Sequence, residues 1–398
     1  MAPTDPVVVA AVRTPFGKFR GSLATVSAID LGAIAIRAAL ERAGVAPAAV
    51  DHCIMGTVVA AGLGQVPARQ AALRAGLPPT VPALTVNKVC ASSLKAVNLA
   101  ALLIRAGEAE VVVAGGMESM TQAPRLLSGT RRGVAMGPLT LADAMLQDGL
   151  TCPVDGVHMG EHGHAVAEEL GVSREAQDAY ALRSQQRYEA ARQAGWIAEE
   201  LVPVPVPAGA GGPALVDRDE QPRPDTTAER LAGLRPVFGG ASGTITAGNA
   251  PGINDGAAVV VLMSRARAAA DGCPVLATWV GSGEVGAEHP YLATVPALAL
   301  ERALARTGGV LTAPDLAVVE INEAFAAVVL TSSRMLGLDL ERVNPNGGAI
   351  AVGHPIGASG ARILGSLVHE LRRRGGGYGA ATICSGLAQG EATLVRVD

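Results

Sequence analysis

The two ends of this chain read as versions of one another, and this internal repeat constrains the fold more than any other feature of the sequence. Each end shows a helix pattern, a short apolar strand, a second helix and a second strand, in that order. In the first part these elements are expected at residues 31–43, 53–58, 90–105 and 111–114, and in the last part at 295–305, 316–321, 357–374 and 379–384. We therefore predict two similar halves that arose by duplication.

Strands that alternate with helices through short connections favour mostly parallel sheets covered by helices on both faces, so we predict an α/β fold. Between the halves the sequence is richer in Pro, Gly and charge, and we predict an inserted, loop-rich domain that contains one confident helix, 173–194, N-capped by Ser173. The predicted organisation is residues 1–118 for the first half, completed by about 248–270, residues 119–247 for the insertion, and 271–398 for the second half.

Composition excludes several classes of function. The net charge of −4 is dispersed and forms no basic stripe of the kind that nucleic-acid binding requires. Apolar runs are interrupted well before the roughly 20 residues that span a bilayer, and no targeting segment is visible at the N-terminus. The five cysteines are odd in number and widely spaced, which predicts reduced thiols. We expect a cytoplasmic protein without nucleic-acid or membrane partners.

Cys90 is the first candidate for chemistry. It follows a predicted strand, 83–86, and immediately precedes a helix whose capping candidates are Ser92 and Ser93. Unpaired N–H groups at a helix start stabilise a thiolate, so the position predicts a lowered pKa for Cys90 and a place to hold an oxyanion. A buried thiol that only fills space under the helix is the alternative.

His354 lies in a glycine-rich loop, residues 344–360, that leads into a helix. A phosphate-binding loop is the alternative, but the spacing fits neither the P-loop nor the dinucleotide fingerprint. The loop is therefore predicted to aim His354, which can act as a base near neutral pH. Cys384 ends a strand and is followed by flexible backbone, and a pseudo-twofold packing of the halves would bring Cys90, His354 and Cys384 together.

Two further polar motifs have competing interpretations. Asn322 and Glu323 follow the apolar strand 316–321, where they either reach the site or cap a helix. The histidines His158, His162 and His164 suggest a metal site, but Gly160 and Gly163 weaken a helix there and no carboxylate partner is evident. We expect polar loop residues and no metal.

Seven motifs in order along the chain resemble those of thiolases, and the resemblance covers essentially the whole chain. The motifs are Val12-Arg-Thr-Pro-Phe-Gly-Lys-Phe-Arg-Gly21, Val86-Asn-Lys-Val-Cys90-Ala-Ser-Ser-Leu-Lys95, Gly115-Gly-Met-Glu-Ser119, Thr246-Ala-Gly-Asn249, Asn322-Glu-Ala-Phe325, Gly347-Gly-Ala-Ile-Ala-Val-Gly-His354-Pro355 and Cys384-Ser-Gly386. The resemblance implies a five-layered αβαβα fold made of two duplicated halves plus a loop domain, in dimers or tetramers.

The resemblance also implies roles for the site residues. Cys90 would be the nucleophile that carries an acyl group, His354 would activate it, and Cys384 would exchange a proton with the substrate carbon or the leaving group. Asn322, through a water, and His354 would form one oxyanion hole, and the N–H groups of Cys90 and Gly386 the other. Coenzyme A would lie on the loop domain as a substrate, not a cofactor; the implied contacts are His158, Met159, Arg223, Ala247, Gly248, Pro251, Leu292 and Phe325.

The sequence departs from the common thiolase pattern at three positions. Ser93 stands where a Gly is usual, Ala388 replaces a Gly in the last glycine-rich run, and Pro251 occupies a position often held by a Ser that touches the ligand. None of these changes removes a catalytic group. They bear on substrate fit and rate more than on the type of reaction.

The resemblance favours the branch that reversibly condenses two acetyl-CoA molecules to acetoacetyl-CoA and CoA, by a ping-pong mechanism through acyl-Cys90. A 3-ketoacyl-CoA thiolase that acts on longer chains in fatty acid β-oxidation is the close alternative. A decarboxylating ketoacyl synthase shares the architecture but relies on two histidines, and here Cys384 takes the second place. An acyl-CoA-binding protein without turnover is the remaining alternative. The expected partners are acyl-CoA, CoA and further copies of the chain, with a homotetramer as the expected assembly.

Overall fold

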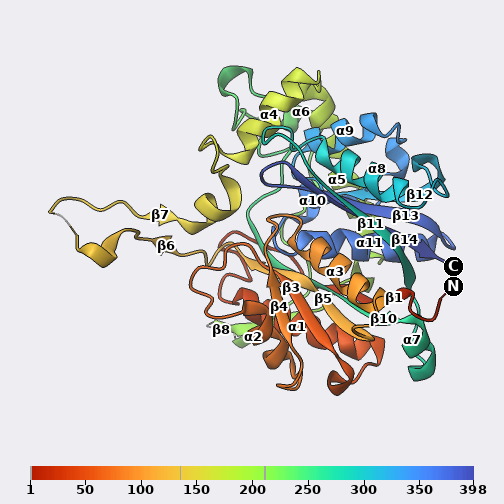
Figure 1. Ribbon diagram of the computed structural model, residues 1–398. Helices are drawn as coiled ribbons and strands as arrows, with labels where there is room; N and C mark the ends of the chain where they lie inside the picture. Colours follow the sequence, from red (N-terminus) through yellow and green to blue (C-terminus); the bar gives the residue numbers. More distant parts are fainter. Residues whose placement is uncertain (1, 135, 210–211) are drawn as a thin grey trace.

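The computed structural model describes residues 2–134, 136–209 and 212–398, without the side chains of residues 207–213 (Figure 1). The first half is built on a sheet with the strand order β4-β3-β5-β10-β1. Its strands are β1 (Pro6–Arg13), β3 (His52–Gly56), β4 (Ala83–Val86), β5 (Val111–Ser119) and β10 (Asn254–Ser264), and the short β2 (Gly17–Lys18) pairs with β10. β3, β4 and β5 are parallel, whereas β10 runs antiparallel to both β5 and β1.

The second half repeats this plan in the order β12-β13-β14-β11. Its strands are β11 (Ala277–Gly286), β12 (Leu316–Ile321), β13 (Gly377–Ser385) and β14 (Gln389–Val397). β12 and β13 are parallel, β14 runs antiparallel to β13 and β11, and a parallel bridge between Val319 and Val343 lies where β4 lies in the first half. The order and direction of the strands therefore repeat between the two halves, as the duplicated sequence predicts.

The prediction of mostly parallel sheets was wrong, because each half mixes parallel and antiparallel pairs. A parallel pair needs a crossover connection, whereas antiparallel strands can be joined by a tight turn, and β13 returns as β14 through such a turn at residues 386–388. The two halves are also hydrogen-bonded to each other through β1 and β11, at Val7 with Thr278 and Val8 with Ala277. This short contact joins the half-sheets into one ten-stranded sheet.

Helices form three layers around the two half-sheets (Figure 1). α1 (Ala28–Ala43) and α2 (Pro67–Ala75) cover the outer face of the first half, α8 (Val295–Ala305) and α9 (Ala326–Met335) cover that of the second, and α3 (Ser92–Arg105) and α11 (Ser359–Arg373) lie between them. Three apolar clusters fill the spaces between layers, and the central one joins side chains of α3 and α11 to strands of both halves. The predicted five-layered αβαβα fold is confirmed.

The local sequence explains where the helices begin and end. α1 starts three residues before the predicted Leu31 because Ser27 caps it, accepting a hydrogen bond from the backbone N–H of Asp30. It ends at Gly44, which takes the left-handed conformation that glycine adopts at low cost. The short α7 (Arg265–Asp271) follows β10 and ends in the same way at Gly272.

A long insertion leaves the sheet between the neighbouring strands β5 and β10. Its elements are β6 (Arg125–Leu126), β7 (Ala142–Asp143), a π-helical turn (Met145–Leu150), α4 (Met159–Glu169), α5 (Arg174–Gln193), β8 (Val204–Gly209), β9 (Gly212–Val216) and α6 (Ala228–Ala232). The segment around β6 and β7 projects from the body as an arm, while α4 and α5 pack on α9 and on α10 (Ala349–Val352) of the second half (Figure 1). Ser173 caps α5 as predicted, whereas the predicted domain boundaries stay predictions.

Within the described ranges, no helix is both long and apolar enough to cross a membrane.

The two halves approach each other backbone to backbone at two glycines. A Cβ placed on Gly116 of β5 would lie 2.0 Å from the carbonyl oxygen of Gly357, in the loop that carries His354. A Cβ on Gly360, in the first turn of α11, would lie 2.5 Å from the backbone nitrogen of Leu94 in α3. Only glycine fits at such distances, and this closeness sets the position of the second half's loop against the first half.

We predict that Gly116→Ala destabilises the protein by about 1–3 kcal/mol, the usual cost of overpacking a tight core. Gly281→Ala is the matched control, because this strand glycine has open space where its Cβ would be. Its effect should stay within about 0.5 kcal/mol. Urea unfolding followed by circular dichroism measures both, and equal midpoints for the two variants would contradict the assigned clash.

Candidate active site

Cys90 lies in a strained turn between β4 and α3. The preceding residue, Val89, has a φ of 44°, a left-handed conformation that is unusual for a β-branched side chain. The turn is held by Asn87 Oδ1, which accepts from Val89 N at 3.0 Å, and by Ser92 Oγ, which accepts from Lys88 N at 2.8 Å. The strain therefore belongs to the turn that positions the candidate nucleophile.

The predicted capping of α3 by Ser92 or Ser93 was wrong. Ala91 stands at the N-cap and makes no side-chain capping bond. Ser92 Oγ serves the turn before the helix, and Ser93 Oγ accepts instead from Ala361 N of α11 at 2.9 Å. Ser93, which departs from the thiolase pattern, thus makes a hydrogen bond between the two halves.

The prediction of a lowered pKa for Cys90 was also wrong. Burial raises the pKa of the Cys90 thiol to about 12, and the nearby Glu118 adds to the rise. The backbone N–H groups of Cys90 and Gly386 oppose the shift by hydrogen bonding to the sulfur, but they do not outweigh burial. Cys90 therefore rests as a thiol, with the two N–H groups that the resemblance assigns to an oxyanion hole directed at its sulfur.

The hydrogen bonds around His354 fix its tautomer. Ser359 Oγ donates to the carbonyl oxygen of Pro355 at 2.9 Å, so the 2.6 Å contact between Ser359 Oγ and His354 Nδ1 requires a proton on Nδ1. His354 N donates to Asn254 Oδ1 at 2.9 Å, which anchors the loop. Burial, and then the nearby Arg362, lower the pKa of His354 to about 3. The imidazole is neutral at pH 7, with Nε2 free to accept a proton.

Asn322 faces His354 from the end of β12. Arg362 Nη2 donates to Asn322 Oδ1 at 3.1 Å, which turns the amide nitrogen of Asn322 toward His354 Nε2 at 3.4 Å. Its neighbour Glu323 points away and accepts from several groups, including Tyr180 Oη at 2.8 Å and Ile350 N at 2.9 Å. Asn322 therefore belongs to the site, whereas Glu323 stabilises the packing of the insertion on the second half.

Glu118 ties the first half to the loop that carries His354. Its buried carboxylate accepts from Val58 N at 3.0 Å, Val59 N at 3.2 Å and Gly357 N at 2.9 Å. Burial raises the pKa of Glu118 to about 7. Sequence reasoning missed Glu118, Ser359 and Arg362 as site residues. An acidic residue near the end of the buried strand β5, inside a quoted motif, was the available signal for Glu118.

Cys384 approaches from the second half. It is the next-to-last residue of β13, and burial, followed by the proximity of Cys90, raises the pKa of its thiol well above the usual value. The turn after it is strained, because Leu387 and Ala388 both have left-handed backbones, with φ of 61° and 45°. The resemblance noted from the sequence implies Gly at position 388. With Ala there, this chain bears a backbone strain that glycine would avoid.

These residues line one mostly apolar cavity of about 280 Å³. Cys90, His354, Cys384 and Gly386 border it, as do six of the eight predicted coenzyme A contacts: His158, Met159, Ala247, Pro251, Leu292 and Phe325. The other two lie outside the lining. Gly248 is buried against Leu231 and Leu234, and Arg223 reaches the rim, where its Nη1 donates to Ala247 O at 3.2 Å. Asn322 stands behind His354.

The expectation that His158 to His164 form a polar loop was wrong. They form the first turns of α4, where His158 is the N-cap and its Nδ1 accepts from Gly160 N at 3.0 Å. The His158 ring also stacks on Phe238, with centroids 4.6 Å apart. Gly160 has no room for a side chain because Phe238 would lie 2.1 Å from its Cβ, so this glycine serves packing.

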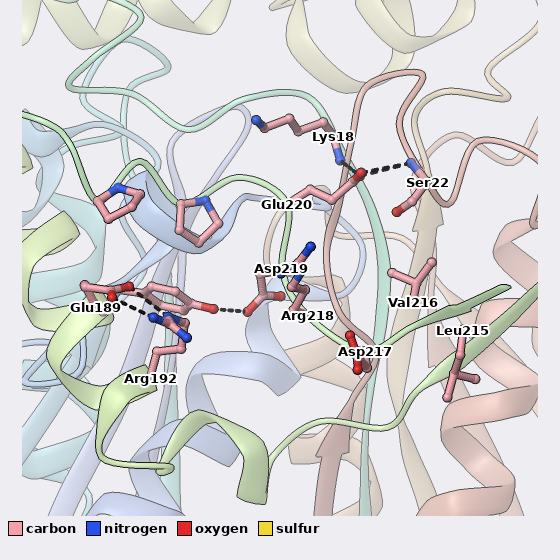
Figure 2. A pocket seen from close by; sticks show the side chains of 13 residues that line it. Lys18, Ser22, Glu189, Arg192, Leu215, Val216, Asp217, Arg218, Asp219 and Glu220 are labelled. Atoms are coloured by element: carbon pink, nitrogen blue, oxygen red, sulfur yellow. Dashed lines mark hydrogen bonds and ion pairs between the residues drawn. The ribbon is translucent and has the colours of Figure 1, made fainter.

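A larger hollow, of about 820 Å³, lies apart from these residues between the first half and the insertion (Figure 2). Many of its lining side chains are charged, but the buried Asp219 and the partly buried Glu220 already have partners. Asp219 accepts a forked pair of bonds from Arg13 and one from Tyr188 Oη at 2.7 Å, and Glu220 accepts from the backbone of Lys18 and Ser22. These bonds attach the insertion to the first half, and the cysteines and His354 lie elsewhere.

Comparison with known proteins assigns the family. The model "Thiolase, N-terminal domain" matches residues 6–266, and "Thiolase, C-terminal domain" matches residues 273–397. Acetyl-CoA acetyltransferases of Cupriavidus necator and Pseudomonas aeruginosa are 51% and 50% identical to this chain, covering 99% and 98% of it and 99% of each relative. A probable acetyl-CoA acetyltransferase of Escherichia coli is 49% identical over 99% of both chains.

The duplicated αβαβα fold, the two family matches, and Cys90 and His354 where the halves meet are together those of an acyl-transferring enzyme. The chain belongs to the thiolase family.

We predict that alkylation of Cys90 by iodoacetamide in the substrate-free protein accelerates about tenfold per pH unit from pH 7 to pH 9, without a plateau. The reactive thiolate fraction grows in this way while the pH stays far below the raised pKa. Peptide mass spectrometry of timed samples measures labelling at Cys90, with the peptide of Cys273 as the internal control. A plateau below pH 8 would show an activated thiolate and contradict the assignment.

Proposed function

We propose that this chain is an acetyl-CoA C-acetyltransferase, which reversibly condenses two acetyl-CoA molecules to acetoacetyl-CoA and free CoA. The observation that carries the proposal is the meeting of two thiols and a neutral imidazole, Cys90, Cys384 and His354, in one small cavity. Relatives of nearly equal length with about half their residues identical are named for this activity, which supports the substrate.

In the first half-reaction, Cys90 attacks the carbonyl carbon of acetyl-CoA while its proton passes to His354 Nε2. Because Nδ1 keeps its own proton and donates it to Ser359 Oγ, the new Nε2–H can donate to the developing negative charge. The bond from carbon to the CoA sulfur then breaks. Cys384 gives its proton to the departing CoA thiolate, which leaves as free CoA, and the product is acetyl-Cys90 with Cys384 as a thiolate.

In the second half-reaction, the Cys384 thiolate removes a proton from the methyl group of another acetyl-CoA. The resulting enolate carbon attacks the acetyl group, the bond to Cys90 breaks, and the Cys90 sulfur recovers its proton from His354. Protons and bonds balance over the cycle. The raised pKa of Cys384 supports both of its roles, because the group is protonated when CoA leaves and strongly basic afterwards.

The size of the cavity favours a short acyl group. Buried bulky side chains, among them Met120, Leu292, Phe325 and Ile356, line this space of about 280 Å³. A long acyl chain would need these side chains to move.

We predict that Cys90→Ser lowers turnover by at least about 10⁴-fold, as loss of a nucleophile does. Intact protein incubated with acetyl-CoA should gain one acetyl group, located on Cys90 by peptide mass spectrometry. A protein that binds acetyl-CoA without becoming acetylated would instead support a binding role without turnover.

We predict that Cys384→Ser still accepts an acetyl group on Cys90, more slowly than wild type because the departing CoA loses its proton donor, but no longer exchanges the methyl hydrogens of acetyl-CoA with deuterated water. The variant keeps the nucleophile and loses the base. Proton NMR follows the exchange, with wild-type protein as the positive control. Exchange at the wild-type rate would assign the base to another residue.

We predict that kcat/KM for thiolysis of acetoacetyl-CoA exceeds that for a 16-carbon 3-ketoacyl-CoA by at least about tenfold, since a hydrophobic pocket discriminates by roughly 10-fold or more per misfitting group. The two substrates are compared in the same assay. Preference for the long substrate would assign the chain to the β-oxidation type of thiolase.

We further propose a cytoplasmic homo-oligomer, a dimer or tetramer. The arm around β6 and β7 extends from the body (Figure 1), and its apolar side chains Leu127, Val134, Leu139 and Leu141 are each 41–54% exposed. Such a projecting apolar surface is typical of a contact between protein copies.

We predict that Leu139→Glu combined with Leu141→Glu reduces the molar mass in multi-angle light scattering, because charges at a buried interface oppose association. Val310→Glu, at an exposed apolar position outside the arm, is the control. An unchanged mass in the double variant would remove the arm from the interface.

A further inference from the structure

Beside the cavity, a tight loop and the start of α4 bring together a thiol, a carboxylate and an imidazole. The loop runs from Thr151 to His158, which pair as an antiparallel bridge. Cys152 N donates to Val157 O at 2.8 Å and Gly156 N donates to Cys152 O at 2.9 Å, so the loop folds back sharply, with Gly156 at a φ of 75°. Cys152 and Asp155 consequently stand on the same side of the loop, with two residues between them.

His162 of α4 completes this group. Its Nε2 lies 2.6 Å from Asp155 Oδ2, and the ligand atoms of Cys152, Asp155 and His162 all lie within 4.8 Å of one another. A fourth candidate ligand comes from the connection between β11 and α8, where His289 Nε2 lies 3.3 Å from the same oxygen of Asp155. The imidazole rings of His162 and His289 are 5.5 Å apart.

The burial and charge of these groups suit a bound cation. Cys152 is buried and the His162 side chain is 6% exposed, whereas Asp155 and His289 are about one-third exposed and leave the group open to solvent. The buried Nδ1 of His162 has no hydrogen-bond partner in the described part of the chain, so the protein alone does not satisfy this ring.

We propose that Cys152, Asp155 and His162, with His289 as the fourth ligand, bind a divalent transition metal ion of the zinc class. A sulfur, two nitrogens and one carboxylate oxygen are donor types that zinc accepts in four-coordinate sites, whereas calcium and magnesium prefer oxygen alone. Two residues separate Cys152 from Asp155, the same number that separates the closest paired cysteine ligands in structural zinc sites. On binding, the thiol proton of Cys152 passes to solvent and the thiolate ligates the ion, while the proton that His162 Nε2 donates to Asp155 moves to the unpartnered Nδ1 and leaves the Nε2 lone pair for the ion.

The position of this metal group, defined as Cys152, Asp155, His162 and His289, indicates a structural role. The four residues come from the 151–158 loop, from α4 and from the connection before α8. Each of these segments borders the catalytic cavity: the first leads to His158, the second begins with Met159, and the third contains Leu292. A bound ion would clamp three parts of the cavity wall to one another without touching the reacting groups.

The three-histidine interpretation considered from the sequence is distinct from this group. His158 caps α4 and faces the cavity, and His164 lies near Thr244, with Nδ1 3.4 Å from Oγ1. Only His162 turns toward the loop. The carboxylate that the sequence did not reveal is Asp155, which comes from seven positions earlier through the fold of the loop.

The test uses the full-length protein, stripped of metals by a chelator, dialysed and kept reduced without thiols, and titrated with Co²⁺. Wild type should bind one equivalent tightly and develop visible bands of tetrahedral intensity together with a near-ultraviolet thiolate-to-cobalt band. Cys152→Ser should lose the near-ultraviolet band, and Asp155→Asn and His289→Gln should weaken binding at least about tenfold, the smallest loss expected even for a supporting residue. Zn²⁺ should displace Co²⁺ and raise the thermal midpoint of wild type but not of Cys152→Ser.

Two controls separate this group from the other thiols. Cys90→Ser and Cys273→Ser should keep the full cobalt spectrum. No binding of one equivalent by wild type, or the same spectrum in wild type and Cys152→Ser, would overturn the proposal. Loss of the thiolate band in Cys90→Ser would also overturn it, because the ion would then lie on the catalytic thiol.

Discussion

The site depends on the close contact between the N-terminal ends of the two central helices, α3 and α11. Ser93 in the first turn of α3 accepts from the backbone N–H of Ala361 in the first turn of α11, and glycine at position 360 lets the backbones meet. The loops that precede these helices carry Cys90 and His354. Because the helix starts are in contact, both loops open onto the same space, and Glu118 binds the second loop to the first half through Gly357. One junction between duplicated halves thus creates the site.

Burial decides the charge state of the groups assembled at this junction. The helix start alone favours a thiolate at Cys90, yet removal from water is the larger effect and leaves a thiol beside a neutral imidazole. An ion pair in this apolar cavity would carry a large desolvation cost. The neutral Cys90 thiol and His354 imidazole avoid this cost in the resting enzyme. They become charged only when an acyl group is present for the sulfur to attack.

Much of the fold follows from the sequence because the repeat and the helical periodicity are strong signals. The strand 316–321 and the helix 295–305 agree with the structure at both ends. The directions of the strands could not be predicted from the sequence. Whether two neighbouring strands are joined by a turn or by a crossover depends on tertiary packing, and the periodicity of the sequence does not show it. The glycines of α4 were misread for a similar reason: Gly160 and Gly163 suggest a broken helix, whereas in the structure they make room for Phe238, Ile245 and Phe325. The pKa of Cys90 was misjudged because depth of burial is a property of the whole fold.

The place of β10 in the sheet has a consequence for biosynthesis. This strand lies between β1 and β5, but it follows them in the chain after the entire insertion. While the ribosome makes residues 120–253, the facing edges of β1 and β5 have no partner. They expose unpaired backbone N–H and C=O groups beside apolar side chains, and these groups can pair with other chains. The nascent enzyme therefore passes through a long aggregation-prone interval that ends only when β10 emerges, and molecular chaperones have most to protect during that interval.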